Sequence, residues 1–126
     1  MTTAALATHP DRARVLSTAV AEAARRLDMT TGDLGRVIGL SQSSASRLMR
    51  GHFALAEGTK NWETAALFIR LYRGLVSIVG NSDELARAWL RSPNRIFGDE
   101  VPLAVIQRID GLVHACEYVD AHRAPA

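Results

Sequence analysis

Polar side chains of the kind that bind nucleic acids are concentrated between residues 41 and 50 of the sequence. Glutamine pairs with adenine and arginine with guanine through two hydrogen bonds, and serine hydroxyls bind bases or phosphates. Residues 36–50 contain three arginines and no acidic residue, so positive charge is local there. We therefore predict a DNA-contacting surface made of Thr31, Arg36, Ser41, Gln42, Ser43, Ser44, Ser46, Arg47 and Arg50.

Other residues have the chemistry of catalytic or metal sites without the required spacing. Glu117 and Asp120 share a helix face, but nothing beside them would divide the two carboxylates into an acid and a base. His114 and Cys116 are two residues apart and face different ways, and no Cys or His cluster has metal-ligand spacing. The serines of residues 41–46 lack the glycine pattern of a nucleophile elbow. We predict no catalytic residue, no metal and no cofactor.

The candidate DNA-contacting residues require two short helices joined by a tight turn. A cap at Thr30 or Thr31 predicts a helix that stops at Gly39, a residue that tolerates positive φ, and Ser41 starts a second helix at about 41–50. This is the arrangement of a helix-turn-helix, in which the second helix faces the base edges. The alternative is a serine-rich, solvated face of a helical bundle. The residues expected to hold the two helices together are Leu34, Ile38, Leu40, Ala45 and Leu48.

The rest of the chain also has helical periodicity, and we predict an all-α fold of about six helices. The four prolines lie outside the long periodic stretches, and no segment alternates apolar and polar residues as a strand would. The expected elements are a loose tail over residues 1–10, a first helix at 11–27 with Val15 on its apolar face, a loop at 52–61, a long apolar helix up to Gly80, and a fifth helix capped by Ser82. A single last helix is expected from Pro102 to about residue 122, with a stripe of Val105, Ile109, Leu112, Cys116 and Val119.

Composition limits the class of protein. The chain has 126 residues and a formal charge of +2, which indicates one domain and excludes a strongly cationic, non-specific nucleic-acid binder. Residues 1–63 carry eight basic and six acidic side chains and residues 64–126 carry seven of each, so the excess lies in the half with the predicted DNA surface. One cysteine, no signal-peptide pattern and no long apolar run predict a cytoplasmic protein without membrane contact.

Beyond the predicted helix-turn-helix, two motifs are more specific. The run WLRSPNRIFG spans Trp89 to Gly98 with Pro102 behind it, and the last periodic segment closes with YVDAHR. Together they resemble the Xre/MbcA/ParS antitoxin family, the antitoxins of RES–Xre toxin–antitoxin pairs, from about residue 15 to residue 123. Many relatives end in Arg-Gly, whereas Ala124 follows Arg123 here.

The resemblance implies a DNA-binding region at residues 11–60 and a toxin-binding and dimerisation region at 61–126. The expected partners are a RES-domain toxin, ADP-ribosyltransferase-like and NAD-consuming, and operator DNA. A homodimer is expected because one recognition helix reads too few base pairs. The alternative is an Xre-like transcription regulator whose C-terminal half only dimerises or senses a ligand. The toxin contacts expected from the motifs are Trp89, Pro93, Asn94, Tyr118, Asp120 and Arg123.

Each of these contacts has a purely structural alternative. Trp89 can seat the last helix in the core, and Pro93 and Asn94 can simply shape a turn. The final residues can form a solvated helix end in which Asp120 and Arg123 pair across one turn, an interaction that contributes only ~0.2–0.5 kcal/mol.

Overall fold

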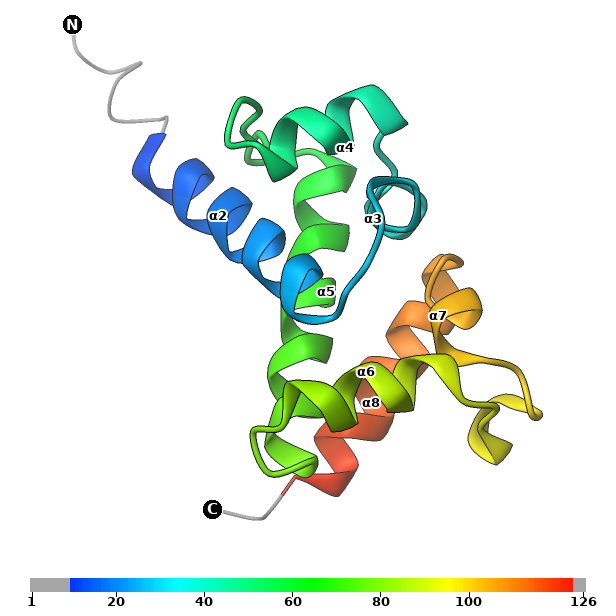
Figure 1. Ribbon diagram of the computed structural model, residues 1–126. Helices are drawn as coiled ribbons and strands as arrows, with labels where there is room; N and C mark the ends of the chain where they lie inside the picture. The colour runs from blue at the N-terminus through cyan, green and yellow to red at the C-terminus, as the bar shows by residue number, and fades with distance from the viewer. Residues whose placement is uncertain (1–9, 124–126) are drawn as a thin grey trace, which may run out of the picture.

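The computed structural model describes residues 10–123, which fold into seven α-helices and one 3-10 helix without any β-strand in that range (Figure 1). The predicted all-α fold is confirmed. The expected tail lies outside the described residues except for Pro10, the first residue of α2. The elements are α2 (Pro10–Arg26), α3 (Thr31–Ile38), α4 (Gln42–Met49), α5 (Lys60–Ile78), α6 (Asp83–Arg91), η1 (Arg95–Phe97), α7 (Pro102–Val105) and α8 (Ile109–His122).

Short polar side chains start four of the helices. The hydroxyl oxygens of Thr30, Ser41, Thr59 and Ser82 each accept a hydrogen bond from the backbone N–H three residues later, which satisfies a donor that the helix leaves unpaired. Thr30, rather than Thr31, caps α3, and Asp33 completes a capping box with it. The helix starts predicted at Ser41 and Ser82 are confirmed.

The last segment is two helices, so the prediction of one helix from Pro102 to residue 122 is wrong. The chain turns at residues 106–108, and Arg108 is extended, with φ −103° and ψ 141°. The turn packs the end of α7 against the first turn of α8, where Gly111 has no side chain to block the Val105 carbonyl. It leaves Ile109 59% exposed, so Ile109 does not belong to the buried stripe. Val15, expected on the apolar face of α2, is also exposed.

The long helix α5 is the centre of the molecule. Phe68 and Leu75 on it are fully buried, and Gly74 lets α8 approach so closely that a Cβ there would lie 2.9 Å from the Cβ of Val119. α5 contacts α2 and α3 as well as α8, as Figure 1 shows for the crossing of α2 over α5. None of the helices described is long and apolar enough to cross a membrane.

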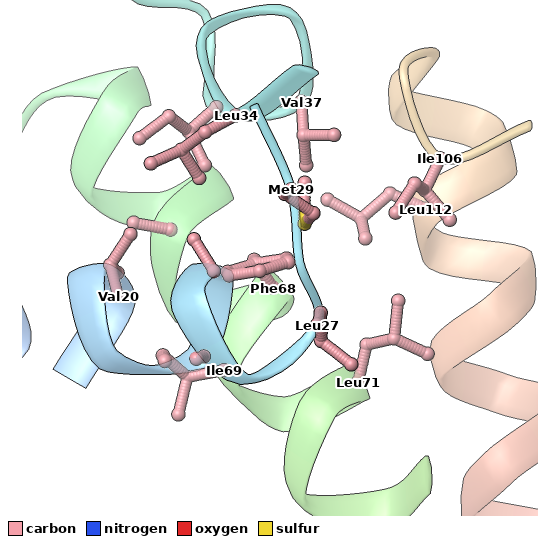
Figure 2. Close-up of a cluster of buried hydrophobic side chains, with 14 of the residues drawn as sticks. Val20, Leu27, Met29, Leu34, Val37, Phe68, Ile69, Leu71, Ile106 and Leu112 are labelled. Carbon is pink, nitrogen blue, oxygen red and sulfur yellow. The ribbon is translucent and has the colours of Figure 1, made fainter. Parts of the chain in front are cut away.

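One continuous core joins the N-terminal and C-terminal elements. Figure 2 shows Met29 and Val37, from the segments around α3, facing Ile106 and Leu112 from the α7–α8 segment, with Leu71 of α5 close by. All five side chains are at least 94% buried. The helix-turn-helix and the C-terminal helices are therefore held on one scaffold, with α5 shared between them.

Candidate functional site

The turn between α3 and α4 is fixed by close backbone packing. Gly39 adopts a left-handed conformation, with φ +78°, and its N–H donates to the carbonyl of Gly35. Gly35 lies so near the turn that a Cβ there would be 2.7 Å from the Leu40 carbonyl oxygen. The side-chain amide of Asn61, the second residue of α5, donates to the carbonyls of Ile38 at 2.8 Å and Gly39 at 2.9 Å. These bonds fasten the turn to the central helix.

Asn61 was not among the residues predicted from the sequence. The sequence shows only that Asn61 lies at the start of the long helix, and the carbonyls to which it donates depend on how α3 and α5 pack.

The residues predicted to hold α3 and α4 together do so. Leu34, Ile38, Ala45 and Leu48 are buried and Leu40 is half-buried.

The exposed face of α4 carries the predicted recognition residues. Gln42, Ser43 and Arg47 are exposed, whereas Ser44 and Ser46 are half-buried, and Ser41 caps the helix. The Arg47 guanidinium donates to the Ser44 hydroxyl at 3.4 Å, and its carbon lies 5.2 Å from the centre of the Phe53 ring. Arg47 is thus directed along the helix surface while its charge stays accessible.

Three of the predicted DNA residues flank this face and differ in their surroundings. Arg36 is exposed but pairs with Asp33 at 2.7 Å, so part of its charge is already compensated. Arg50 is exposed at the end of α4, and Thr31 is half-buried at the start of α3. A further arginine, Arg25 of α2, donates to the Met49 carbonyl at 3.0 Å and completes the C-terminal end of α4. We place the centre of the candidate interface on the first two turns of α4.

A row of aromatic rings crosses the C-terminal elements. Trp89 of α6 stacks on Tyr118 of α8, with 6.1 Å between centroids and 21° between planes, and meets Phe97 of η1 edge-on at 6.0 Å. His122 lies 4.1 Å from Tyr118, and His114 lies 5.1 Å from Phe97. We call these five residues the aromatic row. Trp89 and Tyr118 are both half-buried, so they pack on the core and remain partly accessible.

The loop after α6 has the shape that its residue types predict. The Asn94 side chain accepts a hydrogen bond from the Ile96 N–H at 3.1 Å, and its backbone pairs with Glu100 in an isolated bridge. Gly98 adopts φ +65° and ends the short η1 helix. Pro93 is exposed at the start of the loop, and Pro102 begins α7. The loop therefore holds Pro93 and Asn94 in place whether or not they contact a partner.

Asp120 and Arg123 lie on another side of α8 from Tyr118. Asp120 pairs with Arg70 of α5, not with Arg123, and this hydrogen bond raises the pKa of Arg70 above its ordinary value. Arg123 is exposed beside Gly74, with its Cδ 3.7 Å from the position that a Cβ would take there. The structure thus brings Trp89 and Tyr118 together but does not gather all six predicted toxin contacts into one patch.

The sequence did not lead us to predict the exposed apolar side chains of the C-terminal elements. Leu85 lies one turn before Trp89 on α6 and is 55% exposed, and Ile96 and Val113 are each 37% exposed. Leu85 and Val113 could have been noticed because they fall outside the main apolar stripes of their helices. Leu85 thus extends the face of α6 that carries Trp89, whereas Val113, seven residues before Asp120, lies on the Asp120 side of α8.

Cys116 behaves as the small buried residue that its place in the apolar stripe predicts. Its thiol is 1% exposed and donates to the Leu67 carbonyl at 3.2 Å, and burial raises the pKa of the thiol to about 11. A protonated, buried thiol is a poor nucleophile. Within residues 10–123 no three His, Cys, Asp or Glu side chains come together as a metal site would require.

Comparison with known proteins gives two family matches that adjoin within α5. The family described as the antitoxin Xre-like helix-turn-helix domain matches residues 7–70, and the antitoxin Xre/MbcA/ParS C-terminal toxin-binding domain matches residues 75–124. Among solved structures, a chain in the crystal structure of the M. tuberculosis MbcT-MbcA toxin-antitoxin complex has a similar fold. It has a TM-score of 0.65 and 21% sequence identity over 86% of this chain and 93% of that chain. A search of curated proteins found no match.

Proposed function

Because the chain belongs to the Xre/MbcA/ParS antitoxin family, we propose that it neutralises a RES-domain toxin with its C-terminal half and represses its own operon with its N-terminal half. The observation that carries the proposal is the pair of adjoining matches, to a helix-turn-helix domain and to a toxin-binding domain, on one folded chain. The motif from Trp89 to Gly98 resembles the antitoxins of RES toxins. Bound to such a toxin, the chain closes the NAD site.

For the toxin-binding half, the aromatic row and its exposed apolar neighbours provide the physical basis. Large rigid rings with a polar rim are the residues that contribute most to protein interfaces. Trp89 and Tyr118 would act as anchors, with Pro93 and Asn94 presented by the adjacent loop. Asp120 and Arg123 would contact the toxin at the other side of α8. The fold shared with a chain of a solved toxin-antitoxin complex supports a protein partner for this half.

For the DNA-binding half, α4 would enter the major groove with Gln42, Ser43 and Arg47 towards base edges. Ser41, Ser44, Ser46 and Arg50 would add contacts to bases or phosphates, and Thr31 and Arg36 would do so from α3. Two copies would bind together, because one short helix reads too few base pairs for a specific operator. The two hydrogen bonds donated by Asn61 support this function, because they fix the turn that orients α4 when α4 contacts DNA.

The test of the toxin-binding half is rescue of growth when the chain is expressed with its toxin. Removing α8 would not be informative, because Leu112, Ala115 and Val119 on it are buried and the core would be lost. The double variant Leu85→Glu and Val113→Glu changes only exposed positions. We expect it to fold, to lose rescue and to lose capture of the toxin in a pull-down.

The matched control is Ala56→Glu, which adds a carboxylate at an exposed loop position far along the chain from both helices. It should rescue growth as the parent chain does. Rescue by the double variant would contradict the proposal that the exposed apolar residues of α6 and α8 contact the toxin. A parent chain that binds its promoter in a gel shift but never rescues growth would be a transcription regulator only, and the proposed toxin neutralisation would be wrong.

A further inference from the structure

A groove of about 570 Å³ lies between α2 and α5, apart from the recognition helix and the aromatic row. Its apolar lining comes from both helices. The residues follow helical spacing, so each helix presents one stripe to the groove. The apolar residues are Val15, Leu16, Ala19, Trp62, Ala66 and Ile69.

This lining is accessible in the folded chain. Val15 is 68% exposed, Ala66 is exposed, and Leu16, Ala19 and Trp62 are half-buried. Only Ile69 at the bottom is buried. Exposed apolar side chains gathered in a groove with a charged edge are typical of a protein-binding surface.

The edge of the groove is cationic. Its four charged residues are Arg12, Arg70, Arg73 and Arg123. Arg12 pairs with Glu57 at 3.5 Å and Arg70 pairs with Asp120, but within the described residues Arg73 and Arg123 have no carboxylate partner. Three of the four arginines, from the second half of α5 and the end of α8, lie at one end of the groove, where Arg123 reaches Gly74.

The charge of the edge decides between possible occupants. A second copy of the chain placed two-fold symmetrically on this groove would present the same lining, whose charged residues are all arginines, so it would offer Arg73 and Arg123 no carboxylate from that lining. A partner with apolar side chains on one face and carboxylates at one end complements both features. The stripe on α5 from Trp62 to Arg73 extends over about 16 Å, which is the length of roughly three helical turns.

We propose that this groove binds an acidic amphipathic helix of another protein, with apolar residues against α2 and α5 and carboxylates against Arg73 and Arg123. This is the helix-in-groove mode of recognition, in which residues at i, i+3, i+4 and i+7 provide the anchors. Val15, Ala66 and Arg73 are not among the proposed DNA or toxin contacts, whereas Arg123 lines the groove and is also a proposed toxin contact. The test below therefore changes Ala66 and Arg73 and leaves Arg123 as it is. The inference can therefore fail while the proposed function holds.

The test measures binding of a fluorescein-labelled, helix-stapled peptide of about 14 residues to the full chain by fluorescence anisotropy. The peptide consists of Leu, Ala and Glu, with leucines on one face and glutamates at one end. We expect Arg73→Glu and Ala66→Glu each to weaken its binding about tenfold or more. Both positions are exposed, so the fold is retained.

Matched controls come from α6 and η1. Ala88→Glu and Arg95→Glu make the same changes at exposed positions that do not line the groove, and they should leave the affinity unchanged. A peptide with lysines in place of the glutamates should not bind. Equal affinity for the lysine peptide would overturn the proposal, and so would a dimer that Ala66→Glu converts to monomers in sedimentation, because the groove would then be buried between two copies.

Discussion

Two glycines of α3 allow a direct test of how the helix-turn-helix is assembled. Gly32 and Gly35 lie in the same helix, three residues apart, and replacing either by alanine removes backbone freedom from the unfolded chain. A Cβ at Gly32 would meet only the mobile end of the Arg36 side chain, at 3.3 Å. A Cβ at Gly35 would be 2.7 Å from the backbone oxygen of Leu40. Only the second substitution requires the backbone to move.

The size of the effect can be worked out from these contacts. Ordinary van der Waals contact begins at 3.4 Å, so Gly35→Ala must displace the turn by 3.4 − 2.7 = 0.7 Å. Overpacking of this kind costs ~1–3 kcal/mol. Alanine in place of glycine in a helix gains up to about 1 kcal/mol at either position, and this gain largely cancels in the comparison. We therefore expect Gly32→Ala to be more stable than Gly35→Ala by about 1–3 kcal/mol.

The assay is urea unfolding of both variants and the parent chain, followed by circular dichroism. Gly32→Ala should unfold at the same or higher urea than the parent, and Gly35→Ala at lower urea. Because the displaced turn orients α4, Gly35→Ala should also weaken operator binding in a gel shift, whereas Gly32→Ala should not. Equal stability of the two variants would refute the close packing of α3 against the turn.

Three further predictions concern single side chains. Arg47→Ala and Gln42→Ala should each weaken operator binding by about 1–3 kcal/mol if the side chain makes a bidentate base contact, and unchanged gel-shift affinity in both would show that α4 does not read bases. Asn61→Ala should destabilise the fold by about 1–3 kcal/mol in urea unfolding, since it leaves two carbonyls at the end of α3 without their donor; an unchanged midpoint would contradict this. The thiol of Cys116, whose pKa is raised from 9.0 to about 11, should react with iodoacetamide at pH 8 at least about 100-fold more slowly in the folded than in the unfolded chain. The stability that this shift contributes is present below pH 9 and is lost as the pH rises through 11, and equal alkylation rates would show that the thiol is accessible.

Helix starts were predictable because the chemistry that sets them is local. Ser41 and Ser82 bond to backbone N–H groups three residues away, so the sequence alone contains both partners. The break between α7 and α8 was not predictable in this way. Residues 106–108 contain neither proline nor glycine, and the turn is stabilised by burial of Ile106 and by the contact between Val105 and Gly111. Such contacts exist only once the two helices have folded against each other.

The same distinction separates the two candidate sites. The recognition face belongs to one helix, so spacing was enough to predict that Gln42, Ser43 and Arg47 are exposed. The candidate toxin surface combines α6, η1 and α8. Tyr118 and Asp120 are two residues apart, which corresponds to about 200° around a helix, and their partners are accordingly Trp89 and Arg70 on different elements. The angle could be calculated from the sequence, but the element that each side would meet could not.

Charge shows the limit of sequence counting most clearly. Residues 64–126 carry seven basic and seven acidic side chains, which predicts no cationic surface in that half. Folding nevertheless places Arg70, Arg73 and Arg123 at one end of the groove, and Arg12 from α2 lines the same groove. In the other half, Arg36 contributes to the local excess of charge but is partly compensated by Asp33, one turn before it. An electrostatic surface depends on which helices meet, so its sign must be taken from the fold and not from the net charge of a segment.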